Sequence, residues 1–148
     1  MPHAGLMDEG ALGPEAGPFM RARLHIRGGR RRLRQGKVSA GIVTLYDALE
    51  GAMSWYMASP GRRKNLIIKE GENLNDERTI YGILVRSGVL NGKFDYDSFD
   101  TLVEKALNEE MPDYDWRTLL NDIESVMTQL GVMPFDEAGL PPEDPSTF

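Results

Sequence analysis

The sequence predicts an all-α protein: a single antiparallel bundle of about five helices, with a flexible N-terminal leader and a flexible C-terminal tail. Apolar residues recur at a helical spacing in five separate segments. Glycine, proline or asparagine separates these segments, and the short connections favour antiparallel neighbours. No segment clearly shows the apolar–polar alternation of a half-buried strand. We expect a leader over residues 1–18, a bundle domain over 19–131 and a tail over 132–148.

The segment from residue 36 to 59 is expected to be the central helix. Its apolar residues, with Leu45, Leu49, Ala52 and Trp55 among them, cover most of a helical circumference. Such a helix must be covered by several neighbours, so it indicates the centre of a bundle. Small residues in this segment would let neighbouring helices approach closely: Ala40, Gly41, Ala48, Gly51 and Ala52.

The chain before the central helix predicts a leader and one further helix. Residues 1–18 are rich in glycine and proline and lack periodicity, which is typical of a flexible segment. A helix is expected over residues 19–35. Gly28 and Gly29 lie in its middle, and each is about 1 kcal/mol less favourable there than alanine. We therefore expect this helix to be kinked or broken at the glycine pair.

A third helix is expected after a connection over residues 60–72 that carries a short apolar patch. The helix begins between Asn73 and Asp76, whose side chains can accept hydrogen bonds from free amides. Its core face includes Ile80 and Leu84. Gly88 is a natural C-terminal stop.

The last two helices share an Asp-Tyr-Asp sequence at their entry. One precedes an apolar run from Phe99 to Leu107, and the other precedes a run from Trp116 to Leu130. Aspartate is favourable at a helix N-terminus, where amides lack partners and the helix dipole is positive. Residues 132–148 are acidic and proline-rich, so we expect them to form a mobile tail.

Charge is distributed unevenly along the chain, although the formal net charge is only −6. Residues 21–37 contain seven arginines and one lysine without an acid, whereas residues 93–148 carry fourteen acids against three basic residues. Two interpretations remain open: the basic residues bind phosphate or a partner, or they pair with the acidic half within or between chains. The candidate phosphate- or partner-binding residues are Arg21, Arg23, Arg27, Arg30, Arg31, Arg32, Arg34 and Lys37.

The sequence offers little support for catalysis or metal binding. It has no cysteine and only two histidines, so we expect no cofactor and no metal site. Asp95, Asp97 and Asp100 resemble part of a calcium loop, but Phe99 stands where a ligand is needed, so helix capping is the better interpretation. No catalytic residue is predicted. An enzyme would require a deep pocket that holds two or more carboxylates with raised pKa values.

The segment GKVSAGIVTLYDALEGAM, with the basic helix before it that ends in Arg34-Gln35-Gly36, resembles the first two helices of HEPN-type bundles. The likeness covers about residues 19–58 and includes Tyr46 near the middle of the second helix. Many RNA-cleaving HEPN proteins carry an Arg-x4-His motif on a late helix, and this chain has no histidine after His25. The resemblance therefore implies a non-catalytic helical bundle that dimerises or binds a partner.

These observations predict a non-catalytic helical interaction module that self-associates or binds a protein partner. The alternative is an RNA- or phosphate-binding module that uses the basic N-terminal helix. We expect a homo-oligomer or a protein partner ahead of nucleic acid, and no membrane partner, because no apolar run approaches the roughly 20 residues of a membrane span. We expect a cytoplasmic location.

Overall fold

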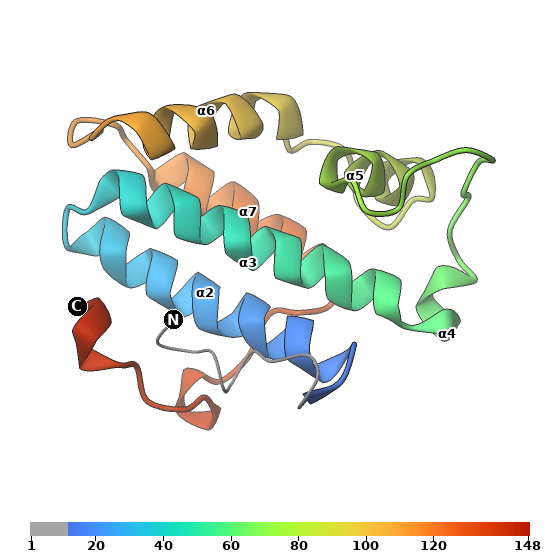
Figure 1. Ribbon diagram of the computed structural model, residues 1–148, viewed down its shortest axis with the longest axis horizontal. Helices are drawn as coiled ribbons and strands as arrows, with labels where there is room; N and C mark the ends of the chain where they lie inside the picture. The colour runs from blue at the N-terminus through green and yellow to red at the C-terminus, as the bar shows by residue number, and fades with distance from the viewer. Residues whose placement is uncertain (1–11) are drawn as a thin grey trace.

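The computed structural model describes residues 12–148, so most of the expected leader lies outside the described residues. Within this range the chain is helical and contains no strand, which confirms the predicted fold class. Five long helices correspond to the five expected ones, and one short helix follows α3 (Figure 1). The α-helices are α2 (Ala16–Arg34), α3 (Val38–Ala58), α4 (Pro60–Arg63), α5 (Glu77–Arg86), α6 (Tyr96–Asn108) and α7 (Arg117–Leu130), and the 3₁₀ turns are η1 (Glu137–Gly139) and η2 (Pro145–Thr147).

Helix α3 is the centre of the bundle, as predicted. It packs against α2 along most of its length and contacts α4, α5, α6 and α7 on other sides (Figure 1). Leu45, Leu49 and Ala52 are fully or almost fully buried, and Trp55 is half-buried. Burying apolar surface on several sides of one helix is the main favourable contribution to the stability of this fold.

Glycines form the contact between α2 and α3. A Cβ added at Gly51 would lie 3.0 Å from the Ala22 backbone nitrogen and 3.1 Å from the Pro18 carbonyl oxygen. A Cβ at Gly41 would lie 2.6 Å from Leu33 Cδ2. The two helices therefore approach closely because these positions have no side chain, as the sequence predicted for Gly41 and Gly51.

The glycine pair in α2 does not break the helix, contrary to the prediction. Helix α2 runs without interruption through Gly28 and Gly29, and both residues are buried. A Cβ at Gly29 would lie 2.9 Å from Leu45 Cδ2 on α3. Packing against α3 thus offsets the low helix propensity of glycine, which is a common outcome when tertiary contacts compete with propensity. The same helix begins at Ala16, before the expected start, and buries Gly17 and Pro18.

Two helix starts follow the predicted capping chemistry, whereas α7 has Trp116 at its N-cap position without a side-chain cap, although the Asp115 carboxylate accepts a hydrogen bond from the Arg117 amide at 3.2 Å. The Asp76 side chain accepts a hydrogen bond from the Thr79 amide at 3.0 Å at the start of α5, and Asp95 accepts one from the Ser98 amide at 3.0 Å at the start of α6. Helix α7 ends at Gly131, which adopts the left-handed conformation with φ of 90°.

An aromatic cluster attaches α5 and α6 to the central helix. Tyr81 on α5 stacks on Tyr96 of α6 with ring centroids 5.2 Å apart. Phe94 lies between Tyr81 and Phe99, and Tyr46 on α3 contacts Phe99. Aromatic pairs contribute apolar burial in preferred geometries, so this cluster fixes the position of the otherwise short helix α5.

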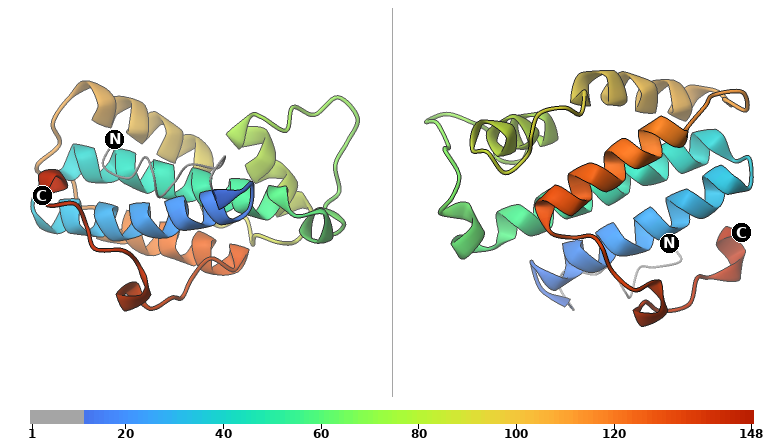
Figure 2. Two further views of the ribbon diagram at one scale, coloured as in Figure 1. Left: turned by 60° about the horizontal axis from the view of Figure 1, so that its bottom comes forward. Right: turned by 180° about the vertical axis from the view of Figure 1, so that it is seen from behind.

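The segment after Gly131 differs from the expected mobile tail. Val132 is fully buried, and Phe135 packs against the core. The chain then turns back and runs beside α2, with its end near the C-terminal part of that helix (Figure 2). Sequence composition alone did not reveal this return, because the contacts that hold it come from residues far away in the chain.

The close approach of α2 to α3 yields a matched pair of substitutions. Gly51→Ala is expected to destabilise the protein by about 1–3 kcal/mol, because the added methyl group meets backbone atoms of α2 that cannot rotate away. Gly82→Ala at an exposed position of α5, where an added Cβ meets nothing within 4 Å, is expected to stabilise the protein by about 0.5–1 kcal/mol through helix propensity alone. Urea unfolding of both variants measures the two effects, and a stabilised Gly51→Ala variant would contradict the close contact.

Candidate functional site

Two of the eight predicted basic residues pair with the central helix. The Arg21 guanidinium lies 3.5 Å from the Glu50 carboxylate, and the Arg32 guanidinium donates to the Thr44 hydroxyl at 3.3 Å. Burial lowers the pKa of Arg32, and neighbouring Arg31 lowers it further. These two arginines face α3 and contribute to the packing of the hairpin.

Four further arginines, Arg23, Arg27, Arg30 and Arg31, form what we call the arginine face of α2. Residues at this spacing lie on one side of a helix. Arg30 bonds to Glu124 of α7 at 2.8 Å and lies 3.4 Å from Glu137. Glu143 lies between Arg27, at 3.5 Å, and Arg31, with which it forms a close ion pair and hydrogen bond.

Aromatic rings of the C-terminal segment also cover this face. The Arg23 guanidinium lies 4.8 Å from the centroid of the Phe135 ring, and its Nε donates to the Val132 carbonyl oxygen at 3.2 Å. The Arg31 guanidinium lies 4.9 Å from the centroid of the Phe148 ring. Burial lowers the pKa of Arg23. The C-terminal segment therefore contacts all four arginines of the face.

The last two predicted residues, Arg34 and Lys37, are exposed, and their side chains form no hydrogen bond or ion pair with another described residue. The eight residues thus do not converge on one site. Six of them are engaged inside the molecule, and three of these, Arg27, Arg30 and Arg31, pair with acids of the acidic half of the chain.

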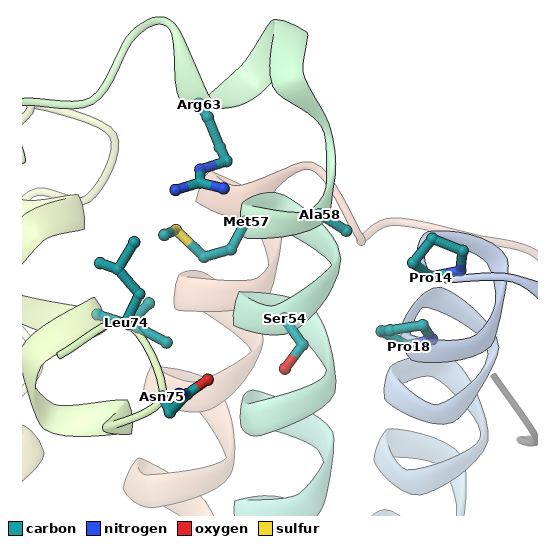
Figure 3. A pocket seen from close by; sticks show the side chains of 9 residues that line it. Pro14, Pro18, Ser54, Met57, Ala58, Arg63, Leu74 and Asn75 are labelled. Carbon is teal, nitrogen blue, oxygen red and sulfur yellow. The ribbon is translucent and has the colours of Figure 1, made fainter.

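A pocket of about 350 Å³ opens at the end of the bundle where α2 begins and α3 ends. Apolar side chains make up most of its lining, with Ser54, Asn75 and Arg63 as polar members. Figure 3 shows Arg63 reaching from α4 over Met57 and Leu74. Arg63 forms no ion pair with another described residue.

Arg62, the residue before Arg63 in the chain, forms structural contacts within the bundle instead. Its guanidinium stacks over the Trp55 ring at 3.8 Å and pairs with Glu15 at 2.9 Å. Arg62 lies beside the N-terminal end of α2, because the Phe19 ring of that helix contacts both the Trp55 ring and the Arg23 guanidinium.

A second, strongly polar pocket of about 270 Å³ lies between α3, the start of α5 and α6. Tyr46 and Tyr96 both line this pocket, and burial raises the pKa of each hydroxyl group. Among the carboxylates of this pocket, Asp76 has a lowered pKa because it accepts hydrogen bonds from Thr79. A carboxyl group with a lowered pKa is ionised near neutral pH, so Asp76 is unsuited to act as a general acid.

The aspartates of the calcium-like sequence have other partners. Asp95 caps α6, and Asp97 and Asp100 each pair with Arg78 at 2.9 Å. Within residues 12–148, no three histidine, aspartate or glutamate side chains are grouped as a metal site would need. No helix in the same range combines the length and apolar character of a membrane span.

Three exposed apolar residues lie at the ends of the bundle. Ile67 and Ile68 in the connection before α5 are 56% and 37% exposed, and Leu107 at the end of α6 is 66% exposed. The sequence analysis placed Leu107 in the core run of its helix. The structure corrects this, because α6 ends one residue later and turns its last apolar side chain away from α3. The polar residues close to Leu107 in the sequence were the feature that could have indicated its exposure.

Comparisons with protein-family models, with curated proteins and with solved structures found no match to this chain. The resemblance to HEPN-type bundles stays a prediction. Functional inference therefore depends on the surfaces described above.

Asp47 on α3 supplies a test of the electrostatics around the hairpin. Burial raises its pKa above the ordinary value of 3.8, while Arg21 and Arg32 lower it in part. Between the unfolded and the raised folded pKa the folded chain binds more protons, so stability falls as pH rises. Asp47→Asn removes this titration. Urea unfolding should show the stability of the variant, relative to the wild type, increasing from about pH 4 to about pH 7; a constant or shrinking difference would contradict the burial of this charge.

Proposed function

We propose that this chain is a non-catalytic interaction module that self-associates head to tail, through two oppositely charged ends that each carry exposed apolar side chains. The observation that carries the proposal is the position of these residues. The connection between α4 and α5, which carries Ile67 and Ile68, lies at one end of the bundle, and the turn between α6 and α7, which follows Leu107, lies at the other (Figure 1).

The basic end presents its apolar pair in a defined conformation. The Arg86 guanidinium donates to the Ile67 carbonyl oxygen at 3.0 Å, and the Ile67 amide donates to the Ser87 hydroxyl at 2.7 Å. Lys64 and Lys69 flank the pair, and both are exposed and without an ion pair among the described residues. A preorganised segment loses little conformational freedom on binding, which supports a docking role for this end.

The acidic end has the complementary composition. Leu107 is surrounded in the sequence by Glu104, Glu109 and Glu110, all exposed, and of these Glu109 pairs with Lys105 at 3.7 Å. Opposite charges around apolar contacts favour association and fix its orientation. The pocket beside Arg63 gives room for an apolar side chain of the second copy. An interface built from a few exposed apolar side chains at each end is expected to be small, and small interfaces are typical of weak, transient association.

Because the two complementary surfaces lie at opposite ends, the association is heterologous. Such an interface closes into a ring or extends as an open chain, depending on the rotation between copies. The alternative is phosphate binding by the basic helix; most of its arginines have acidic or polar partners in the folded chain, so such binding requires that some of those partners leave.

A charge-reversal experiment tests this proposal. Lys64→Glu with Lys69→Glu reverses the basic end, and Glu104→Lys with Glu110→Lys reverses the acidic end. Each double variant alone should self-associate at least about tenfold more weakly than the wild type, because like charges then face each other. An equimolar mixture of the two variants should recover association, since each reversed end meets a complementary end. Sedimentation velocity at low salt measures all three.

Asn121→Lys, an exposed position on α7, is the control for a change of charge away from both ends. Its mass distribution should match that of the wild type. Association in the wild type should weaken when salt is raised, because exposed charges are screened beyond about 10 Å at 0.1 M. A wild type that stays monomeric at high protein concentration and low salt would overturn the proposal, as would a mixture that fails to recover association.

A further inference from the structure

The C-terminal segment contacts the arginine face of α2 through two kinds of group, carboxylates and aromatic rings. Glu137 and Glu143 approach Arg27, Arg30 and Arg31, while the Phe135 and Phe148 rings lie over guanidinium groups (residues of the face: Arg23, Arg27, Arg30, Arg31). Figure 2 shows the segment following α2 rather than crossing it. Two carboxylates therefore lie against the middle of this row of arginines, and a ring lies at each end of it.

Single-stranded nucleic acid presents the same two kinds of group, anions and flat rings, along one backbone. Its phosphates accept forked hydrogen bonds from arginine, and its bases stack on guanidinium planes. A row of arginines on one helix face, free of acids over residues 21–37, fits such a strand. The segment thus occupies the arginine face as a strand of nucleic acid would.

Side chains alone attach the outer part of this segment. Every backbone hydrogen bond formed by residues 136–148 within the described chain is local, such as Gly139 to Asp136 and Phe148 to Pro145. No described side chain of residues 136–148 is buried, whereas Val132 is fully buried. Ion pairs at partly exposed sites contribute little stability each and are screened by salt. Residues 136–148 can therefore leave α2 without opening the core.

The pairing also leaves donors of the arginine face unused. The Nε and Nη2 atoms of Arg27 are buried without a hydrogen-bond partner, although Glu143 lies 3.5 Å from Nε. Buried donors without acceptors are unfavourable. A phosphate group carries more acceptor oxygens than the carboxylate that now lies there, so the present occupant does not satisfy the site fully.

We propose that the arginine face of α2 is a binding site for single-stranded nucleic acid and that residues 136–148 occupy it as an intramolecular competitor. Release of the segment removes Glu143 from Arg27 and Arg31 and Glu137 from Arg30, while Arg30 keeps its pair with Glu124 and Arg23 keeps its contacts with Val132 and Phe135. It also moves four acids away from the arginine face, since the segment carries Asp136, Glu137, Glu143 and Asp144 and no basic residue. This inference is independent of the proposed self-association, which uses the two ends of the bundle.

The test uses the full chain and two isosteric variants. Glu137→Gln with Glu143→Gln weakens the competitor without removing the segment. Glu70→Gln with Asp113→Asn removes two exposed negative charges elsewhere and is the matched control for net charge. Binding of a fluorescein-labelled uridine oligomer and of a thymidine oligomer, each of about 12 nucleotides, is measured by fluorescence anisotropy at about 50 mM and about 200 mM salt.

The Glu137/Glu143 variant should bind at least about tenfold more tightly than both the wild type and the control at low salt, and lose affinity steeply at the higher salt concentration. Adding Arg30→Ala and Arg31→Ala to this variant should abolish the gain. In the wild type, saturating oligomer should sharpen the NMR signals of residues 136–148 as the segment is released.

Two results would overturn the inference. The first is a Glu137/Glu143 variant that folds like the wild type, as shown by circular dichroism and urea unfolding, yet binds the oligomers no more tightly than the control. The second is oligomer binding that leaves the NMR signals of residues 136–148 unchanged, because the strand would then bind elsewhere.

Discussion

Backbone-to-backbone packing between α2 and α3 is the contact on which the rest of this structure depends. Gly29, Gly41 and Gly51 remove the side chains that would keep the two helices apart. One side of α3 is therefore closed by a single neighbour at short distance. Its remaining apolar rows stay available to α6 and α7 on other sides. The same packing uses the glycine side of α2 and leaves the four arginines of the arginine face to project elsewhere, so the hairpin contact sets both the core and the position of that face.

The uneven distribution of charge along the sequence is resolved in space. Basic residues of α2 meet acids from α3, α7 and the C-terminal segment, which are separated from them by up to about a hundred positions in the chain. These pairs are partly exposed, so each contributes little to folding stability. Their effect is to position α7 and the C-terminal segment beside α2. Where burial is greater, as at Asp47, the cost of removing a charge from water exceeds the help from nearby arginines and the pKa rises.

Much of the fold could be predicted from the sequence because it depends on local patterns. Helical periodicity located all five long helices, and the capping residues Asp76 and Asp95 marked two of their starts. The errors have a common physical origin in contacts between distant residues. Gly29 looks like a helix breaker until Leu45 is known to lie against it, and Leu107 looks like a core residue until the end of α6 is known to leave α3. Likewise no local pattern indicates that Glu143 pairs with Arg31. The composition of two distant segments does not say which residue of one lies opposite which residue of the other.

The contacts around Arg62 and those on the arginine face differ in how easily a ligand could displace them. This difference gives the two groups separate roles. Around Arg62 a stacked tryptophan ring, two carbonyl oxygens and Glu15 act together, so displacement would disturb the end of α3. On the arginine face the partners beyond Phe135 belong to a segment without buried side chains among its described residues. A ligand that offers several anions on one backbone competes with all of these contacts at once. It loses the entropy of association once rather than separately for each anion. Arginines that are paired in the folded chain are therefore compatible with a binding role, provided that their partners are held only by the arginines themselves.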